Sequence, residues 1–265
     1  MIRVALSSSA LVGADYKKVL DVAREAGAHG VEWTDQGFVA PGDARASEEV
    51  MFATLRAGLC TVSYATMCRT CMHDRTLFRQ ALETTHQLNA PVLRLWSAPR
   101  DAGSGTANNG FVETARALGD EAGKKGVTLC FGLSADSMLH SSQHAAELLS
   151  AMDHPFVKLA LEPSMDARFD DAMETLTALA GMTGLVMVHA GDVCGQLDGK
   201  DDRAEEWLQY LDAYDEQGDS PDMTRAVVIK SLKDGDDGHT KLCASIGSIR
   251  SWATTLRRYH KRRVL

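Results

Sequence analysis

The sequence contains no long hydrophobic run. Among its 265 residues, no apolar stretch approaches the roughly 18–20 residues that are needed to span a bilayer. Residues 1–14 contain one arginine and a Ser-Ser-Ser centre, which is too polar for the apolar region of a signal peptide. We therefore expect a protein that is neither exported nor inserted in a membrane.

An excess of positive charge is also missing. The chain has 28 Lys and Arg against 36 Asp and Glu, a formal net charge of -8. Nucleic acids and anionic membrane surfaces are bound through basic faces, so an acidic chain is poorly suited to either. The predicted partner is a small polar substrate, with no nucleic acid and no membrane, and a homodimer is left open.

Cysteine is scarce, with six residues in a long chain that has no export signal, which favours a reduced, cytoplasmic protein. Cys68 and Cys71 form a single C-x-x-C motif followed by His73. Such a motif supplies only half of a zinc site, so zinc binding, redox chemistry and two unrelated thiols all stay open, and unrelated thiols are favoured.

A glycine-rich phosphate loop is absent after the first apolar run, where residues 7–13 read SSSALVG. This argues against a doubly wound open sheet.

Instead, short β-branched runs alternate with helix-period stretches. The predicted strands are 2–8, 30–34, 60–66, 92–98, 127–133, 157–163, 185–192 and 226–232. The predicted helices are 15–27, 43–57, 73–88, 109–124, 141–152, 169–180, 203–217 and 242–260. Eight strand–helix units predict an α/β fold, a single (β/α)8 barrel, in one domain over residues 1–265.

In such a barrel, the active site lies at the carboxyl ends of the strands. Glu162, His189 and Lys230 end the predicted sixth, seventh and eighth strands, so they are neighbours on one arc of the rim. A carboxylate, an imidazole and an ammonium in one cleft are typical of proton-transfer catalysis, and a structural ion-pair network is the alternative. Further strand-end residues are candidates for substrate binding: Glu32, Tyr64, Arg94, Trp96 and Asp192.

Several local motifs resemble the xylose-isomerase-like TIM-barrel superfamily, which includes sugar-phosphate isomerases and epimerases, inosose dehydratases and metal-dependent AP endonucleases. The motifs are GVEW at 30–33, LRLW at 93–96, GVTL at 126–129, DHPFVKLALEP at 153–163 and VHAGD at 188–192. Their order covers essentially the whole chain. The resemblance implies a TIM barrel and isomerase or epimerase chemistry. The endonuclease branch is disfavoured by the net charge.

The resemblance also implies four metal ligands at the ends of the fifth to eighth strands, namely a Glu, an acidic residue, a His and a Glu. The matching positions here are Gly132, Glu162, His189 and Lys230, so one ligand is missing and another is replaced by a cation. Three protein ligands are normally needed for a transition metal. We therefore expect no metal cofactor, and if a metal is present, Glu162 and His189 would hold it.

Three functions remain open at this stage. The first is a metal-independent enzyme that transfers a proton on a small polar carbonyl or hydroxyl compound, by isomerisation, epimerisation, dehydration or cyclisation. Its catalytic residues would be Glu162 and His189 as the acid–base pair and Lys230, which would polarise an oxygen or form an imine. The second is a metal-dependent isomerase or epimerase with replacement ligands such as Asp136, Asp192 or Cys68. The third is a non-catalytic relative that binds a sugar-like ligand or another protein.

Overall fold

A computed structural model describes residues 2–66, 74–97, 99, 105–163, 169–193, 203–216, 225–230 and 238–263. Cys68 and Cys71 lie outside the described residues, so the prediction that they are unrelated thiols stays a prediction. Within the described residues, no helix is long and apolar enough to cross a membrane.

The strands form one closed, parallel barrel in the order β1-β2-β3-β4-β5-β6-β7-β8, which confirms the predicted fold. Their bounds are β1 Ile2–Ser7, β2 Gly30–Thr34, β3 Cys60–Ala65, β4 Val92–Trp96, β5 Thr128–Gly132, β6 Val157–Leu161, β7 Thr183–His189 and β8 Arg225–Lys230. Each is one of the short apolar runs of the sequence. Closure pairs β8 with β1, so no strand edge is left open.

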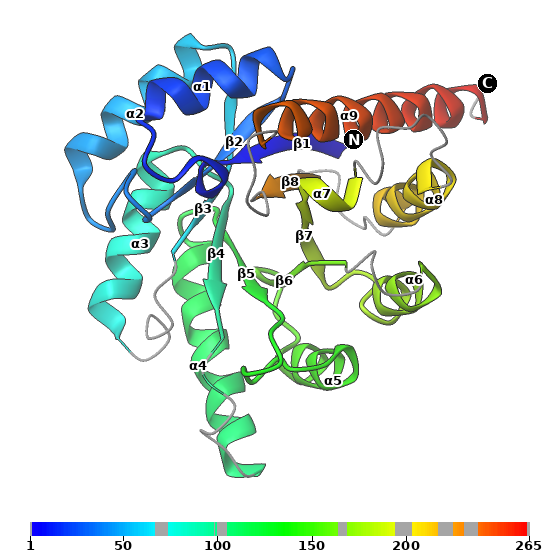
Figure 1. Cartoon of the computed structure of the whole chain (residues 1–265). Helices are drawn as coiled ribbons and strands as arrows, with labels where there is room; N and C mark the ends of the chain where they lie inside the picture. Colours follow the sequence, from blue (N-terminus) through cyan, green and yellow to red (C-terminus); the bar gives the residue numbers. More distant parts are fainter. Residues whose placement is uncertain are drawn as a thin grey trace.

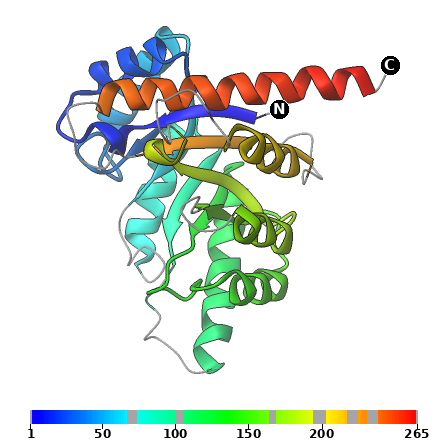
Figure 2. The same ribbon diagram turned by 45° about the vertical axis from the view of Figure 1, so that its right-hand side comes forward.

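Helices connect successive strands and surround the barrel (Figure 1). The main helices are α1 Tyr16–Glu25, α2 Ala44–Arg56, α3 Arg75–Gln87, α4 Gly105–Gly123, α5 Ser142–Met152, α6 Phe169–Ala178, α8 Arg203–Glu216 and α9 Gly238–Arg263. Two short helices were not predicted, η1 Ser8–Leu11 and α7 Ala190–Val193, and each directly follows a strand. Figures 1 and 2 both show the long α9 lying along β1.

Side-chain caps fix where several helices begin. Asp15, Asp43 and Asp74 accept hydrogen bonds from backbone N–H groups in the first turns of α1, α2 and α3. Ser141 does the same for α5. Each cap satisfies a donor that the helix leaves unpaired, which typically contributes about 1 kcal/mol.

The barrel separates two apolar cores. A small inner core fills the barrel with residues such as Ala5, Val92 and Leu185. A larger outer core lies between the strands and the helices and includes Trp33, Phe131 and Trp207. Because side chains alternate between the two faces of a strand, the inner core fixes which strand-end residues point into the barrel mouth.

Candidate active site

Three ionisable side chains meet at the mouth of the barrel. Glu162 directly follows β6, two residues after the inner-core residue Ala160, so alternation directs its side chain inward. His189 and Lys230 are the last residues of β7 and β8, and they are paired in register. The sixth, seventh and eighth strands therefore bring together the three residues that the sequence predicted as neighbours.

Glu162 lies between its two partners. Lys230 Nζ donates to Glu162 Oε2 over 2.6 Å, and His189 Nε2 lies 2.6 Å from Glu162 Oε1. Because an ionised carboxylate only accepts hydrogen bonds, this contact places the ring proton on Nε2. His189 Nδ1 is buried and has no hydrogen-bond partner among the described residues.

The ion pairs change the acidity of the Glu162 carboxyl. Burial alone would raise its pKa, but the Lys230 ammonium and the His189 imidazole outweigh burial and hold the pKa below its usual value of 4.5. The side chains of Glu162, His189 and Lys230 keep 34%, 32% and 17% of their surface exposed. The Glu162 carboxyl is thus ionised at neutral pH, and the three side chains are partly open to a ligand.

A second ion pair, formed by Glu32 and Arg94, is buried inside the barrel below the mouth, and we call this pair the floor. Arg94 donates to both carboxylate oxygens of Glu32, from Nε and from a terminal nitrogen, each over 3.0 Å. Ser7 and Ser63 donate to the same carboxylate over 3.0 and 2.8 Å. Glu32 is fully buried and Arg94 is 7% exposed, so neither of these predicted substrate-binding residues presents its charge at the mouth.

The acidity of Glu32 follows from this pairing. Burial would raise the pKa of its carboxyl, but the charge and hydrogen bonds of Arg94, together with the hydroxyls of Ser63 and Ser7, lower it. In turn, the negative charges of Glu32 and Glu162 raise the pKa of Arg94 against the effect of burial. The floor is therefore a permanently charged pair directly coupled to the mouth.

Tyr64 does not reach the barrel mouth, where the sequence placed it. The pairing of β2 with β3 shifts register between Val31 and Glu32, so Glu32 lies beside Ser63 rather than Val62. This bulge turns Ser63 inward and Tyr64 outward into the outer core. There, the Tyr64 hydroxyl donates to the Val39 carbonyl over 2.7 Å. The prediction of a substrate-binding role was made from the position of Tyr64 near the end of its strand.

Trp96 covers the strand end where the resemblance placed a metal ligand. It ends β4 beside Gly132, its register partner at the end of β5. A Cβ atom added to Gly132 would lie 3.3 and 3.4 Å from two carbons of the Trp96 ring. A carboxylate at position 132 would thus require the indole to move. The predicted substrate-binding residue Asp192 is in α7, but its side chain lies outside the described residues.

The donors at the mouth do not fit a divalent metal. In the described part of the chain, the mouth offers Glu162 and His189, whereas the one group of three candidate ligands lies elsewhere. Lys230 places an ammonium on the carboxylate that would bind the ion. A cation there would have to displace a fixed positive charge and would gain only two protein ligands from the described residues.

The lowered pKa of Glu162 makes a prediction about pH. A carboxyl whose pKa falls on folding adds stability above its unfolded pKa, and this contribution disappears as the pH falls through the folded value. We expect the unfolding free energy of the wild type to exceed that of Glu162→Gln at neutral pH and the difference to shrink below pH 4.5. Urea titrations across this range measure it, and a constant difference would contradict the ion pair.

Comparison with known proteins adds to this geometry. Residues 20–209 match the family described as xylose isomerase-like TIM barrel. The chain belongs to this family. The resemblance found in its strand motifs is thereby confirmed. No curated protein matches the sequence.

Solved structures share the fold of this xylose isomerase-like barrel at low sequence identity. An L-ribulose 3-epimerase has a TM-score of 0.68 at 14% identity, over 100% of this chain and 97% of its own. A D-psicose 3-epimerase with D-tagatose from Clostridium cellulolyticum H10 has a TM-score of 0.67 at 13% identity, over 97% and 99%. A xylose isomerase-like protein from Mycobacterium smegmatis, in complex with magnesium, has a TM-score of 0.68 at 15% identity, over 97% and 98%.

Proposed function

We propose that this protein is an isomerase- or epimerase-like enzyme that transfers a proton on a small polar carbonyl or hydroxyl compound without a metal. The observation that carries the proposal is the contact of 2.6 Å between the Lys230 ammonium and Glu162, at the rim position where the family resemblance implies a carboxylate ligand. The cation that the reaction needs beside the substrate oxygen is then supplied by the chain itself.

Each residue has a separate task in this proposal. Lys230 donates to a substrate oxygen and stabilises the negative charge that develops there as a proton leaves the adjacent carbon. Glu162 takes that proton, and its pKa rises as soon as Lys230 turns to the substrate. His189 donates from Nε2 to the oxyanion or returns a proton to carbon. The electron pair of the broken C–H bond moves into the enolate and returns when carbon is protonated again.

Lys230 acts through its charge in this scheme, not as a nucleophile. An amine must lose its proton before it can form an imine with a carbonyl group. Lys230 Nζ donates to the Glu162 carboxylate, and in this scheme the ammonium keeps its proton throughout. Borohydride added with substrate is therefore expected to trap no covalent adduct.

Solvent deuterium tests the proposed reaction directly. A panel of ketoses, sugar phosphates and cyclic polyols is incubated with the protein in D2O containing a chelator, and NMR follows exchange of carbon-bound hydrogen. D-tagatose, named with one of the similar structures, is a suitable first compound. Exchange should occur with the wild type and disappear in Glu162→Gln. Binding without exchange would favour a non-catalytic relative, and exchange restored only by added metal would favour the metal-dependent alternative.

The metal content of the protein gives a second test. We expect the number of divalent ions per chain to be the same in the wild type and in Glu162→Gln, because the residues described at the mouth do not supply a ligand set. Elemental analysis of both proteins, prepared in parallel, measures this. An ion that is near-stoichiometric in the wild type and lost in Glu162→Gln would show that the mouth holds a metal after all.

A further inference from the structure

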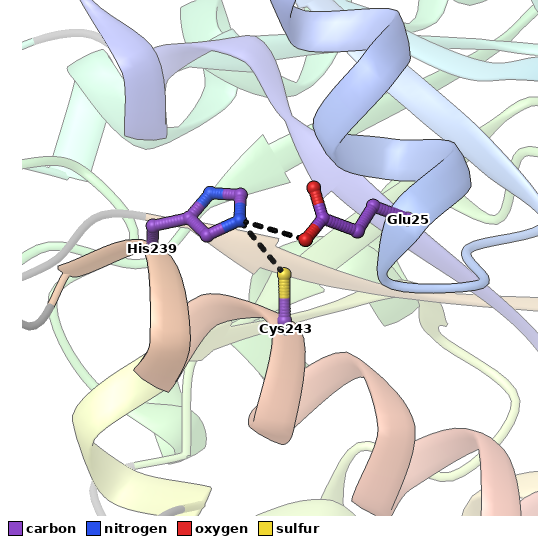
Figure 3. Close-up of side chains that lie close together, drawn as sticks. All are labelled: Glu25, His239 and Cys243. Carbon is purple, nitrogen blue, oxygen red and sulfur yellow. Dashed lines mark hydrogen bonds and ion pairs between the residues drawn. The ribbon is translucent and has the colours of Figure 1, made fainter.

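A second cluster of chemically active side chains lies where the last helix meets the first. We propose that Glu25, His239 and Cys243 form a binding site for a thiophilic divalent transition metal, zinc being the expected occupant. Figure 3 shows the three side chains converging, with the same ring nitrogen of His239 facing both the carboxylate and the sulfur. The cluster is separate from the residues of the barrel mouth.

The distances agree with tetrahedral coordination. His239 Nε2 lies 3.3 Å from Glu25 Oε1 and 3.7 Å from Cys243 Sγ. Around a tetrahedral zinc ion with ordinary bond lengths, neighbouring nitrogen and oxygen ligands are about 3.4 Å apart, and nitrogen and sulfur about 3.6 Å apart. All three ligand atoms lie within 4.8 Å of one another. The two distances from His239 thus match tetrahedral coordination, and the carboxylate oxygen and the sulfur would lie about 3.6 Å apart around a bound zinc ion.

The two elements present the ligands without rearrangement of the backbone. His239 and Cys243 are four residues apart near the start of α9, so they share one face of that helix. Glu25 is the last residue of α1, which packs against α9. The set of carboxylate, imidazole and thiolate is one that zinc accepts, and three protein ligands leave a fourth position for water.

The local charges favour a cation at this place. Glu25 sits at the carboxyl end of α1, where the helix dipole disfavours a negative charge. A divalent ion at this place would offset that unfavourable charge and would bind Cys243 as a thiolate.

Metal binding here would tie α9 to α1. These helices flank the seam where β8 pairs with β1 to close the barrel, so a bound ion would link the two ends of the fold. The expected role is structural, because neither Glu162 nor Lys230 belongs to the cluster. The inference does not depend on the proposed catalytic function.

Titration of the metal-free protein with Zn2+ tests the site. We expect one equivalent of Zn2+ to bind tightly and to raise the thermal midpoint of unfolding. Cys243→Ala and His239→Ala should each weaken binding by about a hundredfold or more, because losing even an outer-shell partner costs up to about that much. Co2+ in place of Zn2+ should show sulfur-to-cobalt charge-transfer absorption that is lost in Cys243→Ala.

Matched controls separate this site from other thiols and from the mouth. Cys60→Ser changes another partly exposed free cysteine, Cys68→Ser/Cys71→Ser removes the C-x-x-C motif, and Glu162→Gln changes the mouth. All three variants should still bind one equivalent of Zn2+ tightly, and with Co2+ they should still show the charge-transfer absorption. The proposal is overturned if Zn2+ does not bind stoichiometrically, or if binding survives in both Cys243→Ala and His239→Ala.

Discussion

Replacing Lys230 with Met should lower kcat/KM by about a hundredfold, because removing one donor aimed at a developing oxyanion costs roughly that much. The methionine side chain is similar in length to that of lysine but carries no charge. Stability should change by no more than about 1 kcal/mol, since the ion pair is partly open to solvent and Glu162 keeps its contact with His189. Deuterium exchange into substrate and thermal unfolding measure the two effects separately.

Lys158→Met is the matched control for this substitution. Lys158 lies near the amino end of β6, where its Nζ donates to the Gly181 carbonyl over 2.7 Å, away from the mouth. We expect this variant to keep its activity, whatever it loses in stability. A Lys230→Met protein that is markedly destabilised but fully active would instead assign Lys230 to a purely structural ion pair with Glu162.

The largest stability loss is expected at the floor of the barrel. Arg94→Met or Glu32→Gln should each lower the free energy of unfolding by about 3–5 kcal/mol, because each leaves the partner's charge buried and unpaired. Glu32 is fully buried and Arg94 nearly so, and together they make two hydrogen bonds of 3.0 Å. Urea unfolding of both variants measures the loss.

The double variant Glu32→Gln/Arg94→Met tests whether the loss comes from the unpaired charge. Its loss should be clearly smaller than the sum of the two single losses, since no buried charge then remains. Lys125→Met serves as the control, because Lys125 and Glu83 form an exposed ion pair of 2.8 Å that should contribute no more than about 1 kcal/mol. Equal losses in Arg94→Met and Lys125→Met would refute the assignment.

The local pattern of the sequence predicted the barrel because each strand and helix has its own periodicity. The residues at the ends of β6, β7 and β8 could be placed together because parallel strands end at one rim. The pairing of β6 with β7 shifts register between Leu159 and Ala160, before Glu162 and His189, whereas β7 and β8 pair without a shift up to His189 and Lys230. For these three residues, their place at the ends of consecutive strands was enough to predict their meeting.

Other features depended on contacts that no local pattern encodes. The bulge opposite β2 reversed the direction of Tyr64, and pairing with Arg94 buried the charge of Glu32. The position of the Trp96 ring over Gly132 is set by side-chain packing between neighbouring strands.

The sequence by itself determined the fold and the rim, because these follow from short-range periodicity and residue type. Only the tertiary structure decided which charges pair and which groups meet across the barrel. His239 and Cys243 share one helix face because α9 begins at Gly238 rather than at 242 as predicted, and Glu25 joins them because closing the barrel packs α9 against α1. Such contacts depend on how the whole chain packs, and the local sequence at either end does not specify them.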